Sequence, residues 1–165
     1  MLRHFVNIVL YLLPPSRLFK LRRLLLKFAK VNISNGVSFC GRSWIYGRGK
    51  LFIGPNTWLS PGVVFYTHKE AEIKIGSSCD IGPGVQFIVG SHEIGNKERR
   101  AGNGISRKIV IGNGVWIGAN STILDGITIG DGCIVAAGSV VHEKIEDNCL
   151  VAGVPARIKR KLDDQ

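Results

Sequence analysis

Aliphatic residues recur at every sixth position through much of this chain. The longest unbroken run lies in the C-terminal half, at Ile111, Ile117, Ile123, Ile129, Val135 and Val141. A period of six matches neither the 3.6-residue turn of an α-helix nor the two-residue alternation of a long strand. It describes a short strand followed by a turn, repeated, with one aliphatic side chain pointing inward each time.

The same period continues toward the N-terminus in shorter runs. They are Ile75, Ile81 and Phe87; Ile53, Leu59 and Phe65; and, less regularly, Ile33, Phe39 and Ile45. Three such units close one triangular coil, and stacked coils bury a continuous aliphatic column. The 21 glycines suit the tight corners of such coils. A glycine-rich β-sandwich is the alternative, but six consecutive positions in one register favour an all-β solenoid over residues 31–162.

Two insertions interrupt the period. The first covers residues 67–72, and the second is a polar stretch at residues 91–107. Insertions in a solenoid emerge as loops from one face, which is often the binding face. The longer one is therefore predicted to be a protruding loop that carries chemistry.

Residues 1–30 form a helical leader with a different composition. The apolar run 5–13 is too short to span a bilayer, and Pro14 and Pro15 end its helix. A second helix is predicted from the N-cap Ser16. Its pattern sets Leu18, Leu21, Leu25 and Phe28 on one face and Arg17, Lys20, Arg23, Lys27 and Lys30 on the other. Such a basic amphipathic helix favours an anionic membrane surface; packing on the solenoid or between subunits is the alternative.

The charge of the chain is concentrated at its two ends. The formal net charge is +10, seven basic residues fall within residues 1–30, and no acidic residue precedes Glu70. A second basic cluster consists of Arg157, Lys159, Arg160 and Lys161. This balance favours an anionic partner. No nucleic-acid-binding motif accompanies it, so we expect a phosphorylated ligand or an acidic membrane rather than nucleic acid.

The four cysteines indicate a reducing compartment. Cys40, Cys79, Cys133 and Cys149 lie far apart and form no CxxC pair. With no cleavable signal sequence in view, they are interpreted as reduced, buried thiols of a cytoplasmic protein. No ligand pair has the spacing of a metal site, so no metal is expected.

The C-terminal half resembles a known family. The run IGNGVWIGANSTILDGITIGDGCIVAAGSVV, followed by VAGVPARIKRKL, is similar to the hexapeptide-repeat acetyltransferases. The pattern is that of the galactoside, maltose and nodulation-factor enzymes and of polysaccharide O-acetyltransferases, and it covers about residues 54–162. The resemblance implies a left-handed parallel β-helix, a homotrimer with active sites between subunits, and acetyl-CoA as co-substrate.

The resemblance also implies roles for individual residues. The motif GSH after IGPGVQFIV makes His92 the general base, and imidazole exchanges protons readily near neutral pH. Trp116 matches a tryptophan beside the acceptor and the pantetheine channel. Ala119 matches a backbone N–H donor to the cofactor or developing oxyanion, and Ala137 a small residue beside pantetheine. Arg157 and Arg160 match cations that face the phosphates of CoA.

The acceptor site is less well defined by the sequence. His68, in the shorter insertion, and Glu98, in the loop, are candidate acceptor contacts, and Glu72, Glu93 or Glu98 is expected to orient His92. We therefore expect O-acetylation of a sugar hydroxyl in a surface polysaccharide or its precursor, by a cytoplasmic enzyme that associates peripherally with the inner face of the membrane. An amino sugar, serine or an antibiotic as acceptor, and a catalytically silent scaffold, are the alternatives.

Overall fold

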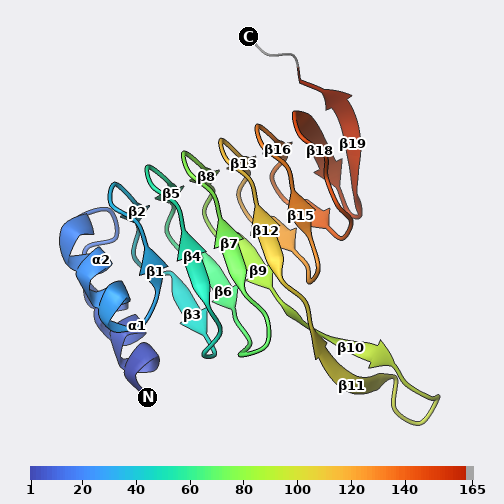
Figure 1. The fold of residues 1–165 in the computed structure, drawn as a ribbon, viewed down its shortest axis with the longest axis horizontal. Coiled ribbons are helices and arrows are strands. Elements are labelled where there is room, and N and C mark those ends of the chain that lie inside the picture. Colours follow the sequence, from blue (N-terminus) through green and yellow to red (C-terminus); the bar gives the residue numbers. More distant parts are fainter. Residues whose placement is uncertain (163–165) are drawn as a thin grey trace.

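The predicted solenoid is present. The computed structural model describes residues 1–162, with helices α1 (Leu2–Leu12) and α2 (Phe19–Phe28) followed by strands that coil into a parallel β-helix (Figure 1). Sheet 1 consists of β1 (Asn32–Ile33), β4 (Leu51–Ile53), β7 (Ile73–Ile75), β12 (Ile109–Ile111) and β15 (Thr128–Ile129). Sheet 2 consists of β2 (Ser38–Phe39), β5 (Trp58–Leu59), β8 (Asp80–Ile81), β13 (Trp116–Ile117), β16 (Ile134–Val135), β18 (Cys149–Gly153) and β19 (Ala156–Lys161). Sheet 3 consists of β3 (Trp44–Tyr46), β6 (Val64–Tyr66), β9 (Gln86–Ile88), β14 (Thr122–Ile123) and β17 (Val140–Val141).

The six-residue period builds the core. Each predicted inward position is buried, and in-register parallel pairing stacks these side chains into three columns, one behind each sheet. In the sheet 3 column the rings of Phe65 and Phe87 stack with their centroids 5.1 Å apart. The irregular first run is part of the same columns, because Ile33, Phe39 and Ile45 are buried as well.

The corners show why glycine and asparagine are frequent. Gly84 has a φ of +70° and Asn120, one coil further on, a φ of +57°. A Cβ atom on Gly84 would lie 2.3 Å from the Oδ1 atom of Asn120. Only glycine fits there, because it avoids both the strained left-handed conformation and the contact.

Polar side chains join successive coils along the corner between sheets 1 and 2. The backbone N–H of Ser77 donates to the Asn113 Oδ1 atom (2.9 Å), and the backbone N–H of Asn113 donates to the Asp131 Oδ1 atom (2.7 Å). The backbone N–H of Asp131 in turn donates to the Asp147 Oδ1 atom (2.9 Å). This corner ladder supplies acceptors for N–H groups at successive turns.

The two helices close the N-terminal end of the solenoid. Val6, Leu10, Leu26 and Ala29 join the buried core. The side chain of Asn7 donates to the carbonyl oxygen of Ile45 (3.0 Å) and accepts from its backbone N–H (3.3 Å). The leader therefore packs on the first coil, and its side chains pair with backbone groups that have no further coil beside them.

The predicted start of the second helix is wrong. The helix begins at Phe19, after Leu18 in the left-handed conformation (φ +60°), and Ser16 does not cap it. The fully buried guanidinium of Arg22 accounts for this connection. It donates to the carbonyl oxygens of Leu10, Leu13, Pro14 and Arg17, at 2.7 to 3.1 Å. These contacts satisfy the end of α1 and the turn after it, and burial lowers the pKa of Arg22.

The helix face predicted to be apolar does not face the core. Of that face, Leu18, Leu21 and Phe28 are exposed and only Leu25 packs against the core, partly buried, whereas Leu26 and Ala29 point inward with Arg22. No helix within residues 1–162 is long and apolar enough to cross a membrane.

Candidate active site

A groove on the outer surface of sheet 2 collects three of the predicted site residues. It has a volume of about 620 Å³ and contains Trp116, Ala119 and Ala137. Its lining also includes Trp58, Ser60 and Asp80, which the sequence analysis did not identify. Trp58, Asp80 and Trp116 are neighbours across adjacent strands, so the Asp80 carboxylate lies between two partly exposed indoles. The Nε1 atom of Trp58 donates to the Oγ atom of Ser60 (3.2 Å).

The row Trp58–Asp80–Trp116 can be recognised in the sequence. Each of the three directly precedes an inward aliphatic residue of the repeat, so all three point outward from the same sheet. Polar and aromatic residues at equivalent outward positions of successive coils could have been grouped in this way.

Ala119 and Ala137 occupy the same place in successive turns of the corner between sheets 2 and 3. On either side of Ala119, the N–H groups of Gly118 and Asn120 donate to the carbonyl oxygens of Val135 and Pro83. The N–H groups of Ala119 and Ala137 themselves donate to no group within residues 1–162. This corner therefore presents two unpaired backbone donors beside the groove, as a thioester carbonyl and the pantetheine amides require.

His92 lies on an antiparallel hairpin rather than in an irregular loop. Strands β10 (Gly90–Ile94) and β11 (Ala101–Ser106) pair with His92 opposite Gly104, and the register shifts between His92 and Ile94. The imidazole is exposed and makes no hydrogen bond within residues 1–162. A bulge beside a reactive side chain changes the direction in which it points.

None of the three candidate acids forms a hydrogen bond or an ion pair with His92. Glu93 accepts a hydrogen bond from the side chain of Asn103 (3.2 Å). Glu98 lies 3.9 Å from the Nζ atom of Lys97, and Glu72 lies 3.2 Å from that of Lys74. Within one chain, the expected carboxylate partner of the base is therefore not in place.

His68 lies at the root of the hairpin. It borders a pocket of about 410 Å³ on sheet 3, lined also by Tyr46, Tyr66 and Gln86. Its Nδ1 atom lies 3.1 Å from the Oγ atom of Ser106, at the end of β11. The shorter insertion and the hairpin thus meet at the same edge of the solenoid.

The hairpin and the corner alanines lie at different edges of the molecule. The hairpin leaves the edge between sheets 3 and 1 (Figure 1). Ala119 lies between β13 and β14, and Ala137 between β16 and β17, which is the edge between sheets 2 and 3. Sheet 3 separates the two. One chain does not bring His92 to the groove.

The predicted phosphate ligands lie on β19, at the C-terminal end of the solenoid. The NH1 atom of Arg157 donates to Glu143 Oε1 (2.7 Å) and lies 3.2 Å from His142 Nε2. Arg160 is exposed and pairs with Leu150, which lines the groove on sheet 2. Arg160 is therefore at the end of the groove, and Arg157 is already ion-paired.

Within residues 1–162, no group of three His, Cys, Asp or Glu side chains is placed to hold an ion.

The chain resembles known proteins in sequence and in structure. The family model of the bacterial transferase hexapeptide (six repeats) matches residues 108–143. The chain is 34% identical over 131 residues to galactoside O-acetyltransferase of Escherichia coli, covering 68% of this chain and 64% of that protein. It is 34% identical over 137 residues to the putative acetyltransferase YvoF of Bacillus subtilis, covering 79% of this chain and 73% of the relative.

A solved structure covers nearly the whole chain. The hexapeptide-repeat acetyltransferase VCA0836 of Vibrio cholerae, complexed with acetyl-CoA, superposes with a TM-score of 0.77 at 30% identity, covering 99% of this chain and 86% of that one. The chain therefore belongs to the hexapeptide-repeat acetyltransferases, and the left-handed β-helix that the sequence resemblance implied is confirmed. It spans 46 to 64% of the length of three of its curated relatives.

Proposed function

We propose that this protein transfers the acetyl group of acetyl-CoA to a hydroxyl group of a sugar. The observation that carries the proposal is the groove beside Ala119 and Ala137, where two backbone N–H groups have no partner within residues 1–162. The relative with acetyl-CoA bound and the galactoside O-acetyltransferase support this donor and this acceptor class.

His92 is the general base of the proposed reaction. The imidazole removes the proton of the acceptor hydroxyl while its oxygen attacks the thioester carbonyl. The backbone N–H of Ala119 stabilises the oxyanion. The C–S bond then breaks, the imidazolium returns its proton to the departing sulfur, and an acetyl ester and free CoA result.

The proposed site is completed by a second subunit. A C3 trimer with sheet 3 facing the threefold axis places the hairpin edge of one subunit beside the groove edge of the next. The outer surface of sheet 3 suits burial, because Tyr46 and Tyr66 are exposed and stack with ring centroids 5.1 Å apart. A carboxylate of the neighbouring subunit can then pair with His92, which has no carboxylate partner within residues 1–162. A stable, active monomer in sedimentation experiments would contradict this arrangement.

The row Trp58–Asp80–Trp116 forms one wall for the acceptor. The Asp80 carboxylate has no hydrogen bond or ion pair within residues 1–162, so it can accept hydrogen bonds from sugar hydroxyls, and the flanking indoles offer flat apolar surfaces with polar edges. A sugar within a polysaccharide or its precursor is the proposed acceptor, in keeping with the resemblance of the chain to polysaccharide O-acetyltransferases. We propose a cytoplasmic site of action, peripheral on the inner face of the membrane, because acetyl-CoA is a cytosolic metabolite and the exposed outer side of α1 and α2 is apolar and basic.

The decisive experiment replaces the base. His92→Ala is expected to lower the rate of CoA thiol release with a sugar acceptor by about 10²- to 10⁴-fold. The affinity for CoA and the thermal midpoint should not change, because His92 is exposed and outside the core. Lys97→Ala, at the tip of the same hairpin, is the matched control and should keep wild-type turnover. If His92→Ala keeps most of its turnover, the base lies elsewhere.

A further inference from the structure

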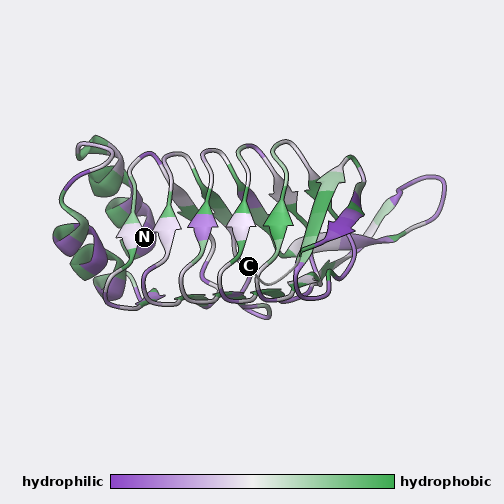
Figure 2. Cartoon of the chain, turned by 90° about the horizontal axis from the view of Figure 1, so that it is seen from above, coloured by the Kyte–Doolittle hydropathy of each residue, from purple (hydrophilic) through white to green (hydrophobic). Residues whose placement is uncertain are grey.

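Helices α1 and α2 together form a cap on the N-terminal end of the solenoid, and the outer surface of this cap is unusually apolar. Large hydrophobic side chains are exposed along both helices and at their ends: Leu2, Phe5, Ile8, Tyr11, Leu12, Leu18, Leu21, Leu24 and Phe28. Figure 2 shows the two helices together at one end of the solenoid, with hydrophobic (green) segments along them. Contiguous apolar patches of this kind are rare on proteins that work free in solution.

These side chains are not needed to close the solenoid. The inner side of the cap is already filled by Val6, Leu10 and Leu26, and Arg22 satisfies the carbonyl groups where α1 ends. Subunits of a trimer with parallel axes lie beside one another, so they leave the axial end uncovered. The outer side of the cap therefore remains available to another surface.

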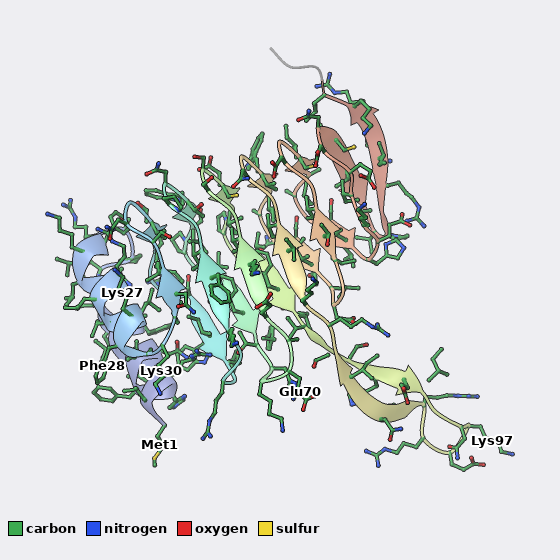
Figure 3. All side chains as sticks on the ribbon, in the orientation of Figure 1. Met1, Lys27, Phe28, Lys30, Glu70 and Lys97 are labelled. Atoms are coloured by element: carbon green, nitrogen blue, oxygen red, sulfur yellow. The ribbon has the colours of Figure 1, made fainter. Side chains whose placement is uncertain are left out.

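The charged side chains of residues 1–30 are all basic. Lys20, Lys27 and Lys30 lie on α2 or next to it, and the chain has no acidic residue before Glu70. Figure 3 shows Lys27, Phe28 and Lys30 together on the helical end of the molecule. A basic border around an apolar surface matches an anionic bilayer, where apolar side chains enter the interface and cations meet the head groups.

A cavity at the border of the cap adds a place for a head group. It has a volume of about 510 Å³ and is lined by Lys30, Arg48, Lys50 and the stem of Arg3, among others. The Arg3 guanidinium donates to the carbonyl oxygens of Gly47 and Gly49, both at 3.0 Å. The corner that carries Arg48 and Lys50 is thus fixed to α1, which holds their charges beside the apolar surface.

We propose that the outer surface of α1 and α2 docks on an anionic lipid bilayer and holds the solenoid end-on, with Arg48 and Lys50 at the level of the head groups. In the proposed trimer all three caps lie at one end and bind the same membrane. The consequence for the acceptor rests on the proposed function: with about 4.8 Å between strands and about 10 Å for the helix layer, the corner of Ala119 stands roughly 25 Å above the membrane. The acceptor sugar is then several units away from its lipid anchor.

Vesicle flotation with the full chain tests the docking. The protein should float with vesicles of equal parts phosphatidylglycerol and phosphatidylcholine at low salt, and should remain unbound with phosphatidylcholine alone. Leu12→Ser, Leu24→Ser and Phe28→Ser combined should abolish flotation, since their exposed fractions of 77%, 65% and 65% make them dispensable for packing. Ile94→Ser and Val154→Ser, with 90% and 71% exposed, are the matched apolar control and should float as the wild type does.

The charged border is tested separately. Arg48→Gln with Lys50→Gln should weaken binding to the anionic vesicles by about 30-fold, roughly five- to sixfold for each cation. Lys97→Gln with Lys144→Gln removes the same charge far from the cap and should have little effect. Wild-type protein that does not float, or a cap triple variant that floats unchanged, would overturn the proposal. If the wild-type protein forms hexamers and the cap variants dissociate them, the surface binds a second trimer instead of a membrane. Thiol release with a soluble acceptor, measured in parallel, separates failure of docking from failure of acetyl transfer.

Discussion

The Nδ1 atom of His68 lies 3.1 Å from the Oγ atom of Ser106, so the insertion before the hairpin contacts the strand that leads out of it. Ser106 is the last residue of β11, and the backbone of His68 forms a bridge with Ala71. The contact restrains the root of a hairpin whose other strand carries His92. His68 can therefore act as a positioning residue, besides the acceptor contact predicted from the sequence.

The two roles of His68 give different kinetics. If it positions the hairpin, His68→Ala and Ser106→Ala should each lower kcat by about three- to tenfold, the scale of one hydrogen bond. The double variant should be no worse than either single one, because both remove the same contact. A raised KM for the acceptor in His68→Ala alone would instead indicate direct contact with the acceptor.

If Arg157 binds the phosphates of CoA, as the family resemblance implies, its ion pair with Glu143 competes with that contact. Arg157→Ala should raise the KM for acetyl-CoA by about 10- to 100-fold and leave kcat nearly unchanged, because a phosphate contact binds ground state and transition state equally. Both side chains are 54% exposed, so the pair itself contributes little to folding. Glu143→Gln should lower the KM, since it frees the guanidinium. An unchanged KM in Arg157→Ala would move the phosphate site toward Arg160.

The row on sheet 2 can be tested through the acceptor. Asp80→Asn should raise the KM for the sugar acceptor by about tenfold or more, the scale of a charge-assisted hydrogen bond, with no change in the KM for acetyl-CoA. Trp58→Ala should have an effect of the same kind. Glu146→Gln, an exposed carboxylate paired with Lys144 at the far end of the chain, is the control. A change in the KM for acetyl-CoA in Asp80→Asn would place the row along the cofactor.

The corner ladder should contribute to stability at every rung. Asp131→Ala removes the acceptor of the Asn113 N–H group and should cost about 1 kcal/mol, which lowers the thermal midpoint by roughly 2 to 4 °C. Asp131→Asn keeps an oxygen at the same place and should be close to neutral. Calorimetry at one protein concentration measures both. Equal losses in the two variants would mean that the charge, rather than the hydrogen bond, matters.

Burial of the thiols predicts how stability depends on pH. Desolvation raises the pKa of Cys40, Cys79 and Cys133, so the folded state disfavours their thiolates. The associated stability is fully present below the ordinary thiol pKa of about 8.5, and is lost as the pH rises through the folded-state values. The urea midpoint should fall between about pH 8 and pH 10, less steeply in Cys79→Ala. Thiol reagents should react with native protein much more slowly than with unfolded protein; rapid labelling of the native state would contradict burial.

The sequence by itself determined the solenoid, its corners and the place of the hairpin. The strands have only two or three residues, and they and the left-handed corners depend on residues close by in the chain. A period of six is therefore sufficient to predict which side chains point inward. The same period indicates that Trp58, Asp80 and Trp116 point outward, although their common place on sheet 2 is apparent only once the coils are aligned in register.

Only the tertiary structure decided which side of the leader faces the core, what Arg22 and Arg157 contact, and that His92 and Ala119 lie at different edges of one chain. These features depend on groups far apart in sequence or on opposite corners of a coil. Arg22 is buried because four carbonyl groups converge on it, and that convergence exists only after α1, the turn and α2 have packed on the first coil. A helical pattern records which residues share a face, whereas the surface that packs against that face is set by the rest of the molecule.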